Sequence, residues 1–459
     1  MQLDLAFRVT NTACLALTGS GGKTATLFQL ARRLSGAGRR PVIVSATTHL
    51  HVDQTRLADS HWICDKPGDL ARLEQTLHGV ILITGPVDGD RTKGLDNNKI
   101  YWLHEFCEQH ALPLLIEADG SRQHPLKAPG ENEPPIPDFV ETVVVVAGLS
   151  GLSQPLNAEF VHRPEVFARL SGLALGETIS PAALLRVLTH QEGGLKNIPE
   201  KARRLVLLNQ ADTPELQAQA KSLADGLLAA YHSVIIASLG QSPVHAVYEP
   251  VAGIILAAGE ARRFGQPKQL LDYHGQPFVR AVAQAALTSG LAPVVVVIGA
   301  NAETVEAAVA DLPVIIARNT AWQNGQSSSI QAGLTALNQP IFDNAFSKSE
   351  RYGEGQVEVG AAVFLLADQP QVTSTVIHAL TGQHAQTLAP ILAPQVAGQR
   401  ANPVLFDRVT FPDLMSLSGD VGGRAIFSKY PVLYLPWQDE SLLLDVDTRD
   451  DLEKLRNRE

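Results

Sequence analysis

Cysteine is scarce in this chain, which has three cysteines among 459 residues, namely Cys14, Cys64 and Cys107. They lie too far apart for a CxxC metal pair and are too few for a framework of disulfide bonds. Nor does any carboxylate or cysteine spacing around His49, His51 and His61 complete a metal site. The scarcity excludes a disulfide-stabilised secreted scaffold and favours a reducing compartment, so we expect a cytoplasmic protein.

The sequence also lacks an excess of basic charge. Its 37 lysines and arginines stand against 47 acidic residues, which leaves a formal net charge of −10. This balance argues against a general nucleic-acid-binding protein, because that class needs an extended basic surface. A local phosphate site remains compatible with it.

Long apolar runs are missing as well. No segment approaches the roughly eighteen consecutive apolar residues that a membrane-spanning helix needs. The N-terminal stretch MQLDLAFRVTNTACLAL contains Asp4 and lacks the cationic start of a signal peptide. The sequence therefore predicts a soluble protein with neither a membrane nor a nucleic-acid partner.

What the chain does have is a regular alternation of apolar strand-like runs and longer helical patterns, which is typical of parallel α/β proteins. Its length predicts two or three domains. The turn-forming segment 239–250 separates two such series. We therefore predict two three-layer α/β domains, residues 1–245 and 250–459, and a long polar surface loop at 338–360 within the second.

The glycine-rich segment GSGGKT follows the apolar run ACLAL and precedes an amphipathic helix pattern. In that position backbone N–H groups can face a phosphate, a lysine can bridge the outer phosphates, and a threonine hydroxyl can ligate Mg²⁺. The spacing is shorter than G-x4-G-K-[ST], because Leu17 stands five residues before Gly22. We predict a P-loop-like nucleotide-binding domain, with a bland glycine turn as the alternative, and assign to it Gly19, Gly21, Gly22, Lys23 and Thr24, the last also to the metal.

Polar residues at further strand ends support this site. Glu117 and Asp119 follow the run LLI, where a carboxylate can hold Mg²⁺ or a water beside the phosphates, and we assign Glu117 to the metal. Asn209 and Asp212 resemble part of the N-K-x-D motif by which GTPases read guanine. Because Gln210 replaces the lysine, both ATP and GTP stay open as the nucleotide.

The motifs GSGGKT, ATTHL, EADGSRQHPLKAPGENEPPIP and VHRPE occur in this order. Together they resemble the selenium-dependent hydroxylase accessory protein family, over about residues 10–240. The resemblance implies a nucleotide-binding role in the maturation of a molybdenum hydroxylase of the xanthine dehydrogenase type, which would be the client protein.

A second motif, VAGIILAAGEARRFGQPKQLL, opens the second series of strands. Small residues at the end of its strand would let a base and a ribose approach the backbone, and the cations after it are available to a triphosphate. A turn followed by a solvated basic face is the alternative. The residues that we assign to the nucleotide are Leu256, Ala257, Ala258, Gly259, Arg263 and Lys268.

Carboxylates from distant positions complete this second constellation. Asp368 follows the run AAVFLLA, and Asp445 and Asp447 stand just before a C-terminal helix pattern. Two of them could converge on one Mg²⁺ that bridges phosphates. Cations with a carboxylate-bound metal are what nucleotidyl transfer needs, because charge must be stabilised on the phosphorus and on the leaving pyrophosphate.

The motifs LAAGEARRFGQPK, NTAWQNGQSSSIQAGL, LADQP, SGDVGGR and DVDTRDDL occur in this order. They closely resemble the molybdenum cofactor cytidylyltransferases over about residues 250–457. The resemblance implies a Rossmann-like nucleotidyltransferase that transfers CMP from CTP to molybdopterin and releases pyrophosphate.

Residue by residue, the resemblance implies roles for several side chains. Gly259, Arg263 and Lys268 would bind CTP, with the last two catalytic. Asp368, also catalytic, would bind Mg²⁺ together with Asp447. The nucleotide and pterin clefts would be lined by Asn319, Trp322, Gly325, Ser329, Asp420 and Arg424.

The sequence departs from that family at several positions. Ala261 and Phe264 replace a common serine and methionine, and the stretch G-x-R-G-H-P reads GQRANP, so that Asn402 offers no proton carrier. LAAG stands where relatives that use GTP tend to read LAGG. Two alternatives stay open: a nucleotidyltransferase that acts on a sugar or alcohol phosphate, and a nucleotide-gated cofactor carrier that transfers nothing.

Overall fold

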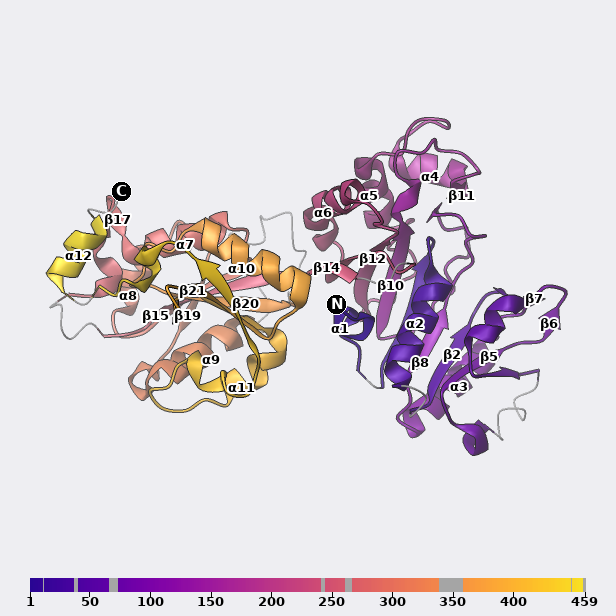
Figure 1. The fold of residues 1–459 in the computed structure, drawn as a ribbon, viewed down its shortest axis with the longest axis horizontal. Coiled ribbons are helices and arrows are strands. Elements are labelled where there is room, and N and C mark those ends of the chain that lie inside the picture. The colour runs from indigo at the N-terminus through magenta and orange to yellow at the C-terminus, as the bar shows by residue number, and fades with distance from the viewer. Residues whose placement is uncertain are drawn as a thin grey trace. The chain divides into compact units, whose positions relative to one another are not determined.

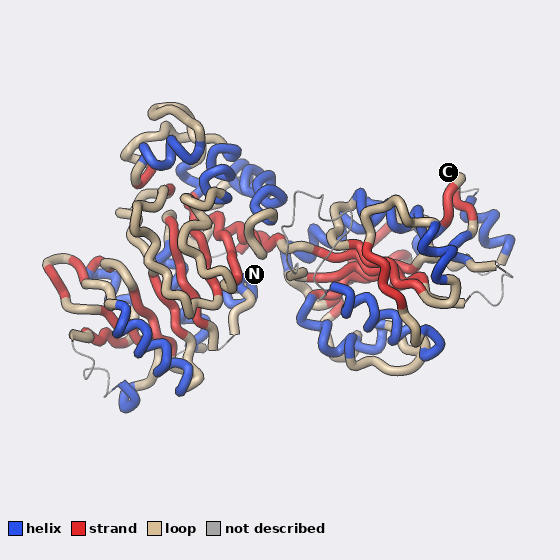
Figure 2. Tube along the Cα trace, turned by 180° about the vertical axis from the view of Figure 1, so that it is seen from behind, coloured by secondary structure: helices blue, strands red, loops and turns tan. Residues whose placement is uncertain are grey.

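A computed structural model of the chain describes residues 1–10, 12–36, 40–65, 73–240, 244–260, 266–337, 358–446 and 448–456 (Figure 1). These residues form two compact units, Met1–Tyr248 and Glu249–Glu459. In each unit, strands form a central sheet with helices around it (Figure 2). The predicted α/β class is confirmed.

The sheet of the N-terminal unit has the strand order β14-β13-β12-β10-β1-β8-β2-β5-β4. β14 runs antiparallel to β13, whereas the other neighbours pair in parallel. The antiparallel strand β14 lies within 239–250, which the sequence predicts only as a turn-forming segment. The strands are β1 (Cys14–Gly19), β2 (Val42–Ala46), β4 (Ser60–Ile63), β5 (Val80–Thr84), β8 (Leu114–Glu117), β10 (Thr142–Gly148), β12 (Arg203–Asn209), β13 (Ser233–Ala237) and β14 (Val244–Tyr248).

Helices cover both faces of this sheet, and its strands are therefore buried on both sides. Leu103 of α3 and Leu223 of α6 share one apolar cluster with Cys14 and Ala16 of β1. The helix α2 packs against β1, β2 and β8, and its buried residues lie outside that cluster. The helices are α1 (Leu3–Phe7), α2 (Lys23–Ser35), α3 (Asn97–Gln109), α4 (Pro164–Ser171), α5 (Pro181–Thr189) and α6 (Pro214–Leu228).

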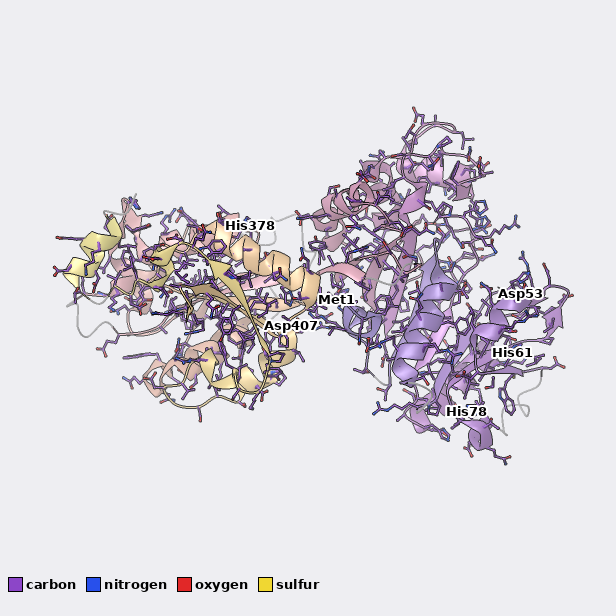
Figure 3. All side chains as sticks on the ribbon, viewed as in Figure 1. Met1, Asp53, His61, His78, His378 and Asp407 are labelled. Atoms are coloured by element: carbon purple, nitrogen blue, oxygen red, sulfur yellow. The ribbon has the colours of Figure 1, made fainter. Side chains whose placement is uncertain are left out.

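Two small sheets lie beside the large one. The order β3-β7-β6 joins β3 (Leu50–His51), β7 (Arg91–Thr92) and β6 (Val87–Asp88), and β9 (Leu126–Lys127) pairs with β11 (Val161–His162). His61 lies on β4 (Figure 3). Its Nε2 lies 2.8 Å from Thr84 Oγ1. Its burial lowers its pKa.

The C-terminal unit has a sheet of order β19-β18-β15-β20-β23-β21-β22, with β24 beside β21. The strands β19, β18, β15 and β20 are parallel, whereas β23 is antiparallel to both β20 and β21. The sheet is therefore mixed. Its strands are β15 (Val251–Ala257), β18 (Val294–Ile298), β19 (Ile315–Arg318), β20 (Ala361–Leu366), β21 (Ile391–Val396), β22 (Gln399–Arg400), β23 (Val404–Asp407) and β24 (Val432–Trp437).

Successive side chains of β15 point to opposite faces of the sheet and belong to two different apolar clusters. The sheet therefore lies between two layers of helices. Ile255 packs with Val282 of α7 and Leu380 of α10, and Ile254 packs with Ile330 of α9. A hairpin of β16 (Asp272–Tyr273) and β17 (Gln276–Pro277) precedes α7. The helices are α7 (Phe278–Thr288), α8 (Ala302–Ala307), α9 (Gln326–Leu337), α10 (Ser374–Thr387), α11 (Phe411–Met415) and α12 (Arg449–Arg456).

Some predictions concern residues beyond this description. Arg263 and Asp447 lie outside the described residues, as does the 338–357 portion of the predicted surface loop. Within the described ranges, no helix combines the length and the apolar character that crossing a bilayer requires.

Candidate functional site

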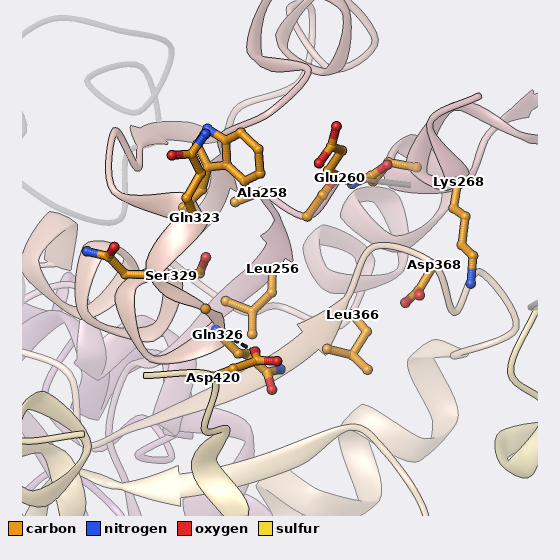
Figure 4. Close-up of a pocket in the computed structure, with 15 residues that line it drawn as sticks. Leu256, Ala258, Glu260, Lys268, Gln323, Gln326, Ser329, Leu366, Asp368 and Asp420 are labelled. Atoms are coloured by element: carbon orange, nitrogen blue, oxygen red, sulfur yellow. Dashed lines mark hydrogen bonds between the residues drawn. The ribbon is translucent and has the colours of Figure 1, made fainter. Parts of the chain in front are cut away.

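A pocket of about 810 Å³ lies at the carboxyl ends of β15 and β20 (Figure 4). These strands are neighbours, and Leu256 pairs with Leu366 at the edge. Polar residues that follow adjacent parallel strands meet at one edge, which is where ligands bind in open α/β sheets. The predicted residues that line this pocket are Leu256, Ala258, Gly259, Lys268, Trp322, Gly325, Ser329, Asp368 and Asp420.

The segment that carries Ala258 and Gly259 is held by a glutamine that the sequence interpretation missed. Gln269 is buried, and its Nε2 donates to Ala257 O at 3.2 Å and to Gly259 O at 2.7 Å. Gln269 follows Lys268, the first residue of the 3₁₀ helix η4 (Lys268–Leu270). Its hydrogen bonds therefore tie the lysine segment to the end of β15.

Two predicted cleft residues lie behind the pocket wall. The side chain of Ala257 belongs to the apolar cluster beneath the sheet. Asn319 is buried, and its Nδ2 lies 2.8 Å from Ser328 Oγ and 3.0 Å from Ser329 Oγ. Asn319 thus positions Ser329, whose side chain does face the pocket.

Asp420 is placed against the start of α9. Its Oδ1 accepts from Gln326 N at 3.3 Å, and Ser327 Oγ donates to Gly419 O at 2.6 Å. Gly325 has φ of 96°, and a Cβ on it would lie 2.6 Å from Asp420 N. Glycine is required here because two backbone segments meet.

Arg424 lies in a second, smaller pocket of about 180 Å³, which shares Leu256, Gln326 and Leu366 with the first. Arg400 and Asn402 line it as well. The Arg400 guanidinium stands 5.5 Å from the centre of the Phe427 ring. Burial lowers the pKa of Arg400, and the neighbouring Arg424 lowers it further.

The carboxylate oxygens at the first pocket fit a hard cation that is also coordinated by oxygen atoms of a bound nucleotide. Asp368 supplies a carboxylate to the lining, whereas Asp445 lies outside it and its Oδ1 accepts from Gln369 Nε2 at 2.9 Å. No group of three or more histidine, cysteine or acidic side chains suited to a metal occurs among the described residues. An Mg²⁺ ion here would therefore need phosphate oxygens as part of its coordination.

The predicted phosphate loop connects β1 to α2. Gly19, Gly21 and Gly22 have φ values of 89°, 85° and 117°, a left-handed region that other residues avoid. A Cβ on Gly22 would lie 2.5 Å from Asn209 Nδ2. No side chain caps the N-terminus of α2, which begins at Lys23.

Lys23 is buried and satisfied within the unit. Its Nζ donates to Gly19 O at 2.7 Å and lies 3.2 Å from Asp119 Oδ1. Glu117 Oε2 accepts from Thr24 Oγ1 at 2.8 Å. Burial raises the pKa of Glu117, although the nearby Lys23 opposes this.

This loop opens on a pocket of about 610 Å³, to which Gly21, Gly22, Lys23, Thr24 and Glu117 contribute. Asn209 lies outside its lining and braces the loop instead. Its Nδ2 donates to Gly21 O at 2.7 Å, and its Oδ1 accepts from Leu239 N at 3.1 Å. Both ends of the amide are therefore engaged, whereas Gln210 faces the pocket.

Sequence matches to known proteins follow the two units. The YqeC protein family matches residues 15–165, and the MobA-like NTP transferase domain matches residues 253–433. The chain is 34% identical to the uncharacterized protein YqeC of Escherichia coli (strain K12) over 205 residues, which are 43% of this chain and 75% of that protein. It is 32% identical over 215 residues to nicotine blue oxidoreductase of Paenarthrobacter nicotinovorans, with 45% of this chain and 96% of that protein covered.

The chain belongs to the YqeC family in its N-terminal half and to the MobA-like NTP transferases in its C-terminal half. Both family resemblances seen in the sequence are thereby confirmed. The MobA-like half makes the protein a nucleotidyltransferase. A solved structure, Rv0371c from Mycobacterium tuberculosis H37Rv, is 26% identical with a TM-score of 0.37, and the match covers 45% of this chain and 97% of that one.

In the YqeC half, the sequence interpretation missed a network of charges in which Lys127 and Asp119 are buried and Glu133 and Arg163 are half-buried. Lys127 Nζ lies 2.8 Å from Asp119 Oδ2 and 2.7 Å from Glu133 Oε2, and Arg163 donates to both oxygens of Glu133 at 2.7 Å. Burial alone would raise the pKa of Glu133, but the hydrogen bonds from Arg163 and Lys127 lower it to about 2. The signal for this network in the sequence is the charge-rich segment EADGSRQHPLKAPGENEPP.

Proposed function

We propose that the MobA-like half transfers CMP from CTP to molybdopterin, giving the cytosine dinucleotide cofactor and pyrophosphate. The observation that carries this proposal is that Lys268, Asp368 and Gly259 line one pocket at adjacent strand ends. A lysine and a carboxylate beside a glycine, whose backbone a ligand can approach closely, suit a triphosphate. The family assignment of this half supports the same reaction class.

The chemistry asks little of the protein beyond position and charge. An oxygen of the pterin phosphate forms a bond to the α-phosphorus of CTP, and the bond from that phosphorus to the bridging oxygen of pyrophosphate breaks. The acceptor phosphate is already anionic, so Asn402 in place of a proton carrier is no obstacle. Lys268 would screen the charge that develops on the phosphates.

Asp368, together with Asp447, would hold Mg²⁺, whose double charge neutralises phosphate oxygens when it is bound. Arg263 would add a further cation beside the triphosphate. The second pocket, with Arg424 and Arg400, would receive the acceptor, because it adjoins the nucleotide pocket through Leu256 and Leu366.

The YqeC half would bind ATP or GTP and aid the maturation of a molybdenum hydroxylase. The glycine loop and the uncapped start of α2, which line one pocket, support nucleotide binding, because the N-terminus of a helix attracts phosphate groups. The hydrogen bonds of Asn209 give it a bracing role, and this leaves the choice between the two purines open.

Product identification tests the transfer reaction. The protein would be mixed with Mg²⁺, the four nucleoside triphosphates and molybdopterin, and the products read by mass spectrometry. We expect the cytosine dinucleotide and pyrophosphate. Asp368→Asn should lower the rate about 10²-fold or more, because a charge is lost where the transition state needs it.

Asp311→Asn is the matched control for that variant. Asp311 pairs with Arg280 on the exposed surface, with an Oδ2 to Nη2 distance of 2.7 Å, and such pairs contribute little. Near wild-type turnover of Asp368→Asn would remove Asp368 from the mechanism. A dinucleotide formed only with sugar or alcohol phosphates would change the acceptor, and nucleotide binding without any product would favour the carrier alternative.

A further inference from the structure

One side of the pocket in the YqeC half is lined by residues that lie outside the glycine loop. Four residues on that side, which we call the basic wall, are Arg122, His124, His162 and Arg163. They come from the segment after β8 and from β11 with its following residue. The wall faces the same 610 Å³ space as Lys23 and Thr24.

The acidic side chains of this pocket are already neutralised by neighbours. Glu133 is held by Arg163 and Lys127, and Glu117 accepts from Thr24 and lies 3.8 Å from Lys23. The remaining charge of the lining is therefore positive, within a chain whose net charge is −10. A cleft of one sign concentrates ligands of the other sign.

The basic wall is a fixed part of the fold. Lys127 Nζ donates to Gly120 O at 2.6 Å, and the ring nitrogens of His124 lie 3.0 Å from Ser121 O and 2.9 Å from Ala158 O. Between these anchors, Arg122 and Gln123 have φ of 48° and 64°. Non-glycine residues persist in this region only where their surroundings hold them.

Two members of the wall retain unused hydrogen-bonding capacity. Within the described parts of the chain, Arg122 forms no ion pair and the ring of His162 forms no hydrogen bond. Burial, with Arg163 and Lys127 nearby, lowers the pKa of His162 to about 4. At neutral pH the ring is therefore uncharged and can donate one N–H to an oxyanion in the pocket, which Arg122 also lines.

We infer that the basic wall binds the oxyanion group of a second substrate, a phosphate or a carboxylate, beside the triphosphate proposed for the glycine loop. This inference rests on the proposed nucleotide site for its biological meaning. It makes the YqeC half a two-substrate site, in contrast to a switch that binds a nucleotide alone. Planar guanidinium groups suit both kinds of oxyanion.

The experiment follows the His162 ring by NMR in the full-length protein with ¹³C-labelled histidines. Its signal is assigned by its loss in His162→Gln. Inorganic phosphate, and acetate in a parallel sample, are titrated with and without the imido analogue of ATP or GTP and Mg²⁺. We expect a saturable shift of the His162 signal that persists when the analogue is bound, and the more effective anion identifies the chemical class.

Arg122→Ser should weaken this anion response about tenfold or more, the effect of losing one charge-assisted hydrogen bond. It should leave the affinity for the analogue within about twofold. Arg169→Ser, at an exposed arginine of α4 outside the pocket, is the matched control and should change neither.

Three results would overturn the inference: no saturable shift of His162, a shift abolished by the analogue, or an Arg122→Ser variant that weakens the analogue as much as the anion. The second and third would assign the basic wall to the phosphates of the nucleotide itself. Failure of the proposed nucleotide binding appears separately, as absence of any response to the analogue. In that case, an anion-induced shift of the His162 signal that depends on Arg122 still supports anion binding at the basic wall.

Discussion

Ala258 is buried at the edge of the C-terminal pocket, in close contact with Gly299. A Cβ on Gly299 would lie 2.8 Å from the Cβ atoms of both Ala258 and Trp322. Ala300 N also donates to Ala258 O at 3.1 Å. The methyl group of Ala258 is therefore held in place, and its position bears on which base can approach the backbone.

We expect the unmodified protein to prefer CTP over GTP, because a bicyclic purine would meet the Ala258 methyl group. One methyl group in a packed pocket is worth about 1–3 kcal/mol, or about 10- to 200-fold. Ala258→Gly should reduce the preference for CTP over GTP, because it removes the methyl group that a purine would meet. The measurement is a competition of CTP and GTP for limiting molybdopterin, with the two dinucleotides quantified.

Ala257→Gly is the matched control, since it removes the same group from the neighbouring residue, whose side chain faces the core. It should lower stability and leave the ratio of products unchanged. Equal yields of the two dinucleotides from the unmodified protein would mean that Ala258 does not select the base.

At the scale of the element, the connection between β1 and α2 shows how tightly the glycine loop is built. Gly21 lies against the backbone of Gly148 at the end of β10, and a Cβ on it would lie 2.9 Å from Pro125 O. Ser20 N donates to Val146 O at 2.8 Å. The loop is thus confined by backbone, which cannot move aside as a side chain can.

Gly21→Ala should therefore lower the free energy of unfolding by about 2–5 kcal/mol, the sum of left-handed strain and overpacking. Gly36→Ala is the control: Gly36 ends α2 with φ of 55°, and nothing lies within 4 Å of a Cβ there. That variant should show the strain alone, about 1–2 kcal/mol. Urea unfolding measures both, and equal losses would contradict the overpacking.

At the scale of the whole molecule, the chain consists of two units that divide between Tyr248 and Glu249. Pro250 O accepts from Gly360 N at 2.9 Å, so the residue before β15 is bonded to the second unit. The turn-rich segment of the sequence led to the prediction of separate domains at 1–245 and 250–459. Whether each folds and acts alone is a further prediction.

We expect a fragment of residues 249–459 to fold and to transfer CMP at a rate close to that of the full chain, because it contains a complete sheet and the apolar clusters that pack around it. Its urea transition should coincide with one of those of the intact protein. Lys23→Ala in the intact chain should leave the transfer unchanged. Loss of transfer in that variant would show that the two units are coupled.

The sequence by itself determined what depends on neighbours along the chain. Alternating apolar runs predicted the strands and helices, and the glycine-rich segment between a strand and a helix predicted a phosphate loop. The order of motifs predicted both families. The resemblance of the second half implied that Gly259, Lys268 and Asp368 act on the same nucleotide and its metal, and these three residues line one pocket.

Only the tertiary structure decided which motif residues face a pocket and which support it. Asn319 and Asn209 turn inward to hydrogen-bond partners, and Arg424 lies in a separate pocket beside Arg400. The charges of Lys127, Glu133 and Arg163 meet only because the small β9–β11 sheet brings their segments together. Such contacts depend on packing between segments distant in the chain, which local patterns in a single sequence do not encode.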